Sequence, residues 1–265
     1  MTKRPAKSFN TDGPCDPSFH YMLPVIPRLK GVDELLLRRL YFILHAPRRS
    51  GKTTCLKFLA DRINREGRWY ALNCSLASLG NIRGRDEAVT GIVGQINLAL
   101  ESSPVEAIRD KAFAYDSLPA MKRPGTKVRK ILNQLCRDLD RDLVVFFDGA
   151  DLLSGQGLVS FLSQVRDGFL YRDGTVNRFP RSMALVGRRD IRDNPADHSP
   201  GDGLEEDCGF FDIAGASLTL ADFSKDEIRI LYGQHSEATG QVFDDSALER
   251  AWDWSEGQPW LVNAL

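Results

Sequence analysis

The sequence is poor in cysteine, in long apolar runs and in net charge, and each shortage excludes a class of protein. Its five cysteines are widely spread and form no C-x-x-C pair, so we expect neither a disulfide framework nor a zinc site. No apolar run approaches the roughly 18–20 residues that a membrane-spanning helix needs. The 35 Lys and Arg residues balance 36 Asp and Glu residues, so no overall positive field favours nucleic acid or an anionic membrane. The basic N-terminus has no apolar segment typical of a secretory signal, and we expect a soluble, cytoplasmic protein.

Short apolar runs alternate along the chain with segments of helical spacing. Runs such as Tyr41–Leu44, rich in aromatic and β-branched residues, are typical of strands buried on both faces of a parallel sheet. Strands are predicted at 41–44, 69–74, 143–147, 182–187 and 217–220. Helices are predicted at 32–40, from 53 to about 63, and at 89–100, 128–139, 156–169, 224–238 and 245–255. This alternation predicts an α/β fold, a parallel sheet flanked by helices.

The same pattern suggests a division of the chain. We expect an N-terminal arm and helix at 1–40, an α/β core at 41–220 and a small helical lid at 221–265, whose completeness the sequence leaves open. Segment 101–128 interrupts the alternation and is predicted to be a surface insertion. Segment 188–210 is rich in Asp, Gly and Pro and is predicted to be a mobile loop.

The most informative stretch is Ala46–Thr54, which matches the G-x-x-x-x-G-K-[ST] phosphate loop except that Ala46 replaces the first glycine. Gly51 lets the backbone bend so that successive N–H groups face a polyphosphate, next to the N-terminus of the following helix. Lys52 is expected to reach the β- and γ-phosphates, and Thr53 to bind Mg²⁺. The predicted nucleotide contacts in the loop are Pro47, Arg48, Arg49, Ser50, Gly51, Lys52, Thr53 and Thr54.

An acidic residue ends the apolar run 143–147. Asp148 would lie at the carboxyl edge of a parallel strand, where ligands bind in open α/β sheets, so it is predicted to bind Mg²⁺ with Thr53. The next residue, Gly149, can do no proton chemistry. Asp151 is therefore either the catalytic base or an ordinary helix cap, and the residues leave both open.

Arginines follow the predicted strand 182–187. A guanidinium matches phosphate oxygens, so Arg188 or Arg189 is predicted to sense the γ-phosphate. The basic residues Lys122, Arg123, Lys127, Arg129 and Lys130 lack interleaved aromatic residues, and we favour a solvated surface over a nucleic-acid site.

Together these residues resemble the AAA-like and STAND-type P-loop ATPases. The likeness is strongest to bacterial AAA-like ATP-binding proteins with an arm of the form FNTxGPCDPxxHYMLP, which here spans Phe9–Pro24, and a loop of the form YFxLHAPRxxGKTT, which spans Tyr41–Thr54. It extends to Ser255–Leu261, which resembles the G-x-P motif of the helical lid.

The resemblance implies a five-stranded parallel sheet in which strand 182–187 lies between the strands that end at the phosphate loop and at Asp148. It also implies that Tyr21 and Arg28 lie near adenine and ribose and that Pro259 covers the base. The departure is Gly149, because this likeness leads us to expect Glu after Asp148. The lid tryptophans Trp252, Trp254 and Trp260 are expected in the lid core rather than against the base.

The expected function is that of a P-loop protein that binds ATP and Mg²⁺, a slow or partner-dependent ATP hydrolase that acts as a nucleotide-gated switch. The catalytic candidates are Lys52, Asp148, Asp151, Arg188 and Arg189. One alternative is a signalling module that binds nucleotide without hydrolysis, and another is a nucleic-acid-associated AAA-like ATPase. A small-molecule P-loop kinase is less favoured because no phosphoacceptor pocket is evident. A protein partner or effector and an oligomer are compatible with the sequence, and it indicates no membrane partner.

Overall fold

The computed structural model describes residues 7–115, 124–172, 177–191 and 212–265. These residues form two compact units. One, here the sheet unit, comprises Gly31–His45 and Leu59–Thr219. The other, here the phosphate-loop unit, comprises Met1–Lys30, Ala46–Phe58 and Leu220–Leu265. Lys122, Arg123 and most of the predicted loop 188–210 lie outside the described residues.

The described residues of the sheet unit form five parallel strands. They are β1 (Tyr41–His45), β2 (Tyr70–Ser75), β3 (Leu143–Asp148), β4 (Ser182–Gly187) and β5 (Ala214–Thr219). Their order is β2-β3-β4-β1-β5, and every neighbouring pair is parallel. The predicted five-stranded parallel sheet is confirmed, and so is the position of β4 between β1 and β3.

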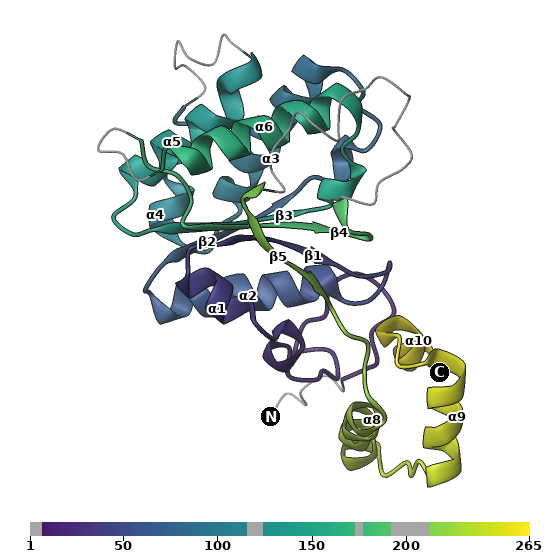
Figure 1. The fold of residues 1–265 in the computed structure, drawn as a ribbon. Helices are drawn as coiled ribbons and strands as arrows, with labels where there is room; N and C mark the ends of the chain where they lie inside the picture. The colour runs from purple at the N-terminus through teal and green to yellow at the C-terminus, as the bar shows by residue number, and fades with distance from the viewer. Residues whose placement is uncertain (1–6, 116–123, 173–176, 192–211) are drawn as a thin grey trace. The chain divides into compact units, whose positions relative to one another are not determined.

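Helices cover both faces of the sheet, as Figure 1 shows. On one face lie α3 (Arg85–Glu101), α4 (Glu106–Arg109), α5 (Lys127–Asp138) and α6 (Gly155–Leu170). On the other lie α1 (Val32–Leu37) and the second half of α2 (Lys52–Glu66). Helices on both faces explain why β1, β3 and β4 are apolar almost throughout, since neither side of these strands meets water.

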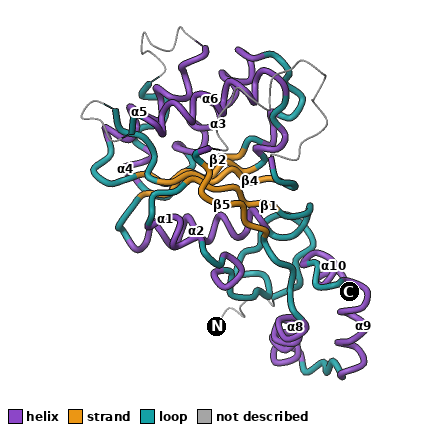
Figure 2. Tube along the Cα trace, in the orientation of Figure 1, coloured by secondary structure: helices purple, strands orange, loops and turns teal. Residues whose placement is uncertain are grey.

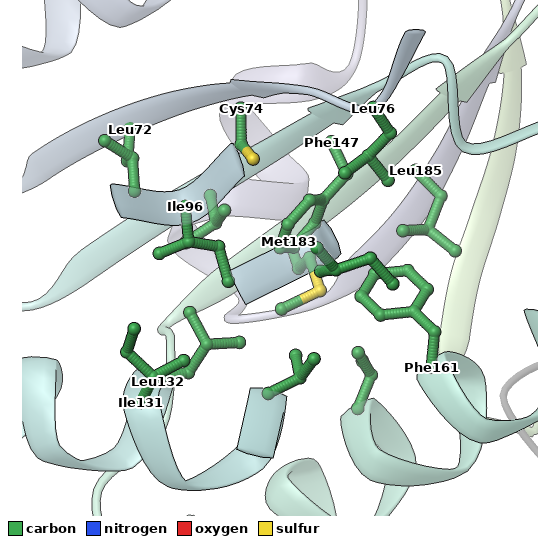
Figure 3. Packing of buried hydrophobic residues seen from close by; sticks show 14 of the residues in the cluster. Leu72, Cys74, Leu76, Ile96, Ile131, Leu132, Phe147, Phe161, Met183 and Leu185 are labelled. Carbon is green, nitrogen blue, oxygen red and sulfur yellow. The ribbon is translucent and has the colours of Figure 1, made fainter. Parts of the chain in front are cut away.

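The largest core cluster lies between the sheet and helices α3, α5 and α6. Figure 3 shows Phe147 and Met183 of the sheet pointing toward Phe161 of α6, and the Phe147 and Phe161 rings meet edge to face with centroids 5.1 Å apart. Ile108 and Tyr115 are also buried in this cluster. The prediction that 101–128 is a surface insertion is therefore wrong for this part of the segment, because its apolar residues help to close the core.

The phosphate-loop unit is mostly helical outside the loop itself (Figure 2). It contains the short 3₁₀ turn η1 (Ile26–Leu29) and helices α8 (Lys225–Thr239), α9 (Asp245–Ser255) and α10 (Pro259–Ala264). Ser224 and Glu227 form a capping box that begins α8. A second core cluster joins the arm to these helices and consists of Tyr21, Leu23, Phe223, Ile228, Leu231, Tyr232, Ala251 and Val262.

Two of the three lid tryptophans depart from the expectation. Trp252 packs against this second cluster as expected, but Trp254 is 68% exposed and is not lid core. Trp260 is half-buried and contacts the phosphate loop. In the part of the chain that the structure describes, no helix is both long and apolar enough to span a bilayer.

Candidate nucleotide site

The phosphate loop follows β1 directly and leads into α2. Gly51 has φ +85°, a left-handed conformation that side chains with a Cβ rarely adopt, which explains the glycine at this position. The ammonium group of Lys52 donates hydrogen bonds to the carbonyl oxygens of Ala46 and Pro47, at 2.6 and 2.7 Å. Lys52 thus curls back over its own loop, which is the position from which an ammonium group can meet a phosphate that enters the loop.

Arg28 clamps the loop from the arm. Its Nη2 donates to the carbonyl oxygen of Ser50 at 3.0 Å and to that of Ala221 at 2.5 Å. Its guanidinium carbon also lies 4.9 Å from the ring centroid of Phe223. Arg28 therefore ties three stretches together, the arm, the phosphate loop and the chain after β5, a role that the sequence did not indicate.

A cavity of about 60 Å³ lies beside the loop, within the phosphate-loop unit. It is lined by five of the predicted nucleotide contacts, namely Tyr21, Arg28, Gly51, Thr54 and Pro259. Its other lining residues are Cys15, Met22, Leu23, Val25, Cys55, Phe223, Leu231 and Asn263. A mostly apolar lining with a few polar groups is typical of sites that bind small molecules.

Among the described residues, two buried hydroxyl groups of this unit lack a hydrogen-bond partner. Tyr21 is 4% exposed, and among the described residues neither its Oη nor the buried Oγ of Ser50 has a hydrogen-bond partner. A buried hydroxyl group without a hydrogen-bond partner lowers the stability of the folded protein. Tyr21 is also one of the residues that line the cavity, which makes its unpaired Oη a candidate group for a ligand.

Arg28 also sets the local charge. Burial raises the pKa of the Cys55 thiol, and Arg28 partly opposes the rise. Partial desolvation likewise raises the pKa of Asp222, again against Arg28. Cys55 is thus a neutral thiol at pH 7, and it serves as a small apolar group in the cavity wall.

The strand ends of the sheet unit carry the predicted acidic residues. The register pairs Asp148 with Val186 and His45 with Gly187, so β3, β4 and β1 end at one edge of the sheet. The backbone oxygen of Asp148 accepts a hydrogen bond from Leu76 N–H at 2.7 Å. Residue 46, where the phosphate loop begins, follows His45 directly.

Asp151 turns back toward the end of β4. Its Oδ2 accepts a hydrogen bond from the backbone N–H of Arg188 at 3.0 Å. A Cβ at Gly187 would lie 2.8 Å from the Cβ of Asp151, so only glycine fits beneath this side chain. Asp151 is not the cap of α6, because Ser154 holds that position. The helix-cap alternative is therefore wrong, and the sequence carried no signal for the contact with β4.

The arginines after β4 are at the surface. Arg188 and Arg189 are exposed, and the next residue, Asp190, is buried and accepts a hydrogen bond from the Ser217 hydroxyl at 2.6 Å. Asp190 thus links the end of β4 to β5. The sequence did not single it out, because a carboxylate within a run of charged residues looks like a solvated one.

The sequence matches no protein-family model and no curated protein. Solved structures are similar in fold. A Walker-type ATPase of Pyrococcus abyssi is 19% identical, with a TM-score of 0.58 over 96% of this chain and 69% of that one. Cdc6p from Pyrobaculum aerophilum is 17% identical, with a TM-score of 0.55 over 94% of this chain and 62% of that one.

A third similar structure is the ORC1 protein of Aeropyrum pernix in complex with DNA, 15% identical, with a TM-score of 0.53 over 92% of this chain and 59% of that one. This chain therefore spans about three fifths of the length of two of these proteins. The chain has the fold of a P-loop ATPase. At these identities the likeness shows the fold alone.

Proposed function

We propose that this chain binds ATP with Mg²⁺ and hydrolyses it slowly, as a nucleotide-gated switch. The observation that carries the proposal is that two sets of residues, predicted on independent grounds, lie around one cavity. The phosphate loop, predicted from its motif, borders a cavity lined by Tyr21, Arg28 and Pro259, which were predicted from the resemblance. The fold shared with the Walker-type ATPase supports the same conclusion.

In this proposal Lys52 and the loop amides stabilise charge on the transferring phosphoryl group, the main source of catalysis in this chemistry. Thr53 and Asp148 supply the oxygen ligands that Mg²⁺ prefers. When bound, Mg²⁺ would neutralise charge on the β- and γ-phosphates. Arg188 or Arg189, both exposed at the end of β4, would report the presence of the γ-phosphate.

The weak point for hydrolysis is the base. Gly149 stands where a carboxylate would orient water, and the Asp151 carboxylate already accepts a hydrogen bond from Arg188 N–H. One oxygen of this carboxylate is therefore already engaged by the backbone and is less available to orient a water molecule. This contact favours the second candidate function, a module that binds ATP and signals through its conformation without hydrolysis.

We do not propose a nucleic-acid function, although the ORC1 structure contains DNA. Two of the basic residues have partners within the protein: Arg129 lies 3.5 Å from Asp167, and Lys127 donates to the Thr90 hydroxyl at 3.1 Å. These contacts agree with a solvated surface.

The test is Mg-ATP turnover by the purified chain beside Lys52→Ala. Loss of the ammonium group is expected to lower turnover by about 100-fold or more. Lys57→Ala is the matched control, because Lys57 is an exposed lysine of the same helix and its removal is expected to change nothing. Equal turnover in all three proteins would show contamination and reject autonomous hydrolysis. Calorimetry with ATP then tests whether the chain binds ATP without hydrolysing it, as the second candidate function requires.

A further inference from the structure

The phosphate loop holds one residue in an unfavourable backbone conformation. Arg49 has φ +68°, in the left-handed region where the Cβ of an L-residue is crowded. Gly51, two residues later, adopts such a conformation at no steric cost, but Arg49 does not. Such a conformation persists only where the surroundings hold it in place.

The group that holds Arg49 is the indole of Trp260 in α10. The guanidinium carbon of Arg49 lies 4.0 Å from the centroid of the Trp260 ring, within cation–π range. The indole is fixed in turn, because its Nε1 donates a hydrogen bond to the carbonyl oxygen of Thr11 at 2.7 Å. The arm, α10 and the loop thus meet at one side chain.

A second contact joins α10 to the neighbouring loop residue. The side-chain oxygen of Gln258 accepts a hydrogen bond from Leu261 N–H at 2.8 Å and so begins the helix. Its amide nitrogen donates to the carbonyl oxygen of Arg48 at 3.3 Å. Helix α10 therefore contacts two consecutive residues of the loop, Arg48 through its backbone and Arg49 through its side chain.

We propose that Trp260 is a positioning residue for the phosphates of the nucleotide. By stacking on Arg49 it holds the left-handed turn that orients the peptide group between Arg49 and Ser50 in the loop. Without the stack, Arg49 relaxes toward a right-handed conformation and this peptide group rotates. The inference rests on the proposed function, since it presumes that the loop amides bind phosphate.

This role predicts a selective loss of affinity. Trp260→Leu is expected to weaken ADP and ATP binding by about tenfold, ~1.4 kcal/mol. Adenosine has no phosphate, so its affinity is expected to stay the same. A general loss of structure would weaken all three ligands.

Glycine at position 49 provides the decisive variant. Arg49→Gly adopts the left-handed turn without the stack. In this background the stack is no longer needed, so adding Trp260→Leu to Arg49→Gly is expected to change the ADP affinity by less than about twofold. Trp260→Phe keeps an aromatic face for Arg49 but loses the hydrogen bond to Thr11. It is expected to bind ADP within about threefold of wild type, which separates the effect of the stack from that of the hydrogen bond.

The experiment is calorimetry of ADP, ATP and adenosine with these four proteins and wild type, together with the Nε–H resonance of Arg49. That resonance is expected to carry a ring-current shift that disappears in Trp260→Leu. Unchanged ADP affinity in Trp260→Leu would overturn the positioning role. So would a further loss of about tenfold when Trp260→Leu is added to Arg49→Gly, because the indole would then act by a route other than the turn at Arg49. If wild type binds neither ADP nor ATP, the proposed function itself fails, an outcome distinct from either of these.

Discussion

The two units differ in how fully their buried polar groups are paired by hydrogen bonds. Among the described residues of the sheet unit, Nε of Arg62 is buried without a hydrogen bond, but it lies 3.7 Å from Glu66 and the other nitrogens of this guanidinium pair with Asp33. Its buried carboxylate Asp190 is bonded to Ser217. In the phosphate-loop unit the orphaned atoms include whole hydroxyl groups, those of Tyr21 and Ser50.

The hydrophobic cores of the two units also differ. The sheet unit buries a continuous apolar cluster from both sheet and helices, whereas the phosphate-loop unit has a small cluster beside an open cavity. The sheet unit therefore forms a packed apolar framework. The phosphate-loop unit instead keeps two buried hydroxyl groups that have no hydrogen-bond partner among the described residues.

The largest expected effect is a loss of stability in the core of the sheet unit. Phe161→Ala removes a fully buried ring that packs on Phe147 and is expected to lower the free energy of unfolding by about 3–5 kcal/mol. Nucleotide affinity of the folded protein is expected to be unchanged. Denaturant titration measures the first and calorimetry the second.

The matched variant is Leu231→Ala, which removes a buried side chain from the cavity wall of the other unit. It is expected to cost about 2–3 kcal/mol, the lower part of the range for such truncations, and to lower nucleotide affinity as well. If Phe161→Ala changed affinity and Leu231→Ala did not, the proposed division of labour would be wrong.

A smaller effect is expected at the end of β3. Glutamate at position 149 is the obvious way to restore the missing carboxylate, but Gly149 has φ +82° and its Cβ would lie 3.3 Å from Ala77 N. Gly149→Glu is therefore expected to lower the free energy of unfolding by about 1–2 kcal/mol without raising turnover. Thermal unfolding and Mg-ATP turnover test this, and a faster enzyme of undiminished stability would contradict it.

The smallest effect has the opposite sign in the free protein. Tyr21→Phe removes the orphaned hydroxyl and is expected to raise the free energy of unfolding by about 1 kcal/mol. The same change is expected to weaken ATP binding, because the proposed ligand loses a polar partner. Tyr232→Phe is the control, since its hydroxyl already donates to the carbonyl oxygen of Val262 and its loss is expected to destabilise. Weaker folding of both variants would show that Tyr21 has a partner in solution.

Much of the fold was predictable from local pattern. The strands from Tyr41, Leu143 and Ser182 are apolar because both of their faces are covered, and such runs stand out in any sequence. The phosphate loop was predictable for a similar reason, since the conformation of Gly51 is a local requirement. The segment around Ile108 and Tyr115 was misjudged because its apolar residues follow no helical or strand period.

Local sequence predicted the α/β alternation, the phosphate-loop motif and the acidic residue that ends β3, because each depends on neighbours within a few positions. Only the tertiary structure decided that Arg28 clamps the loop, that Asp151 faces Arg188 rather than capping a helix, and that Trp260 stacks on Arg49. These contacts join residues that lie between 22 and 211 positions apart. No periodicity records such a pairing, because long-range contacts are set by how the chain packs and not by the residues on either side.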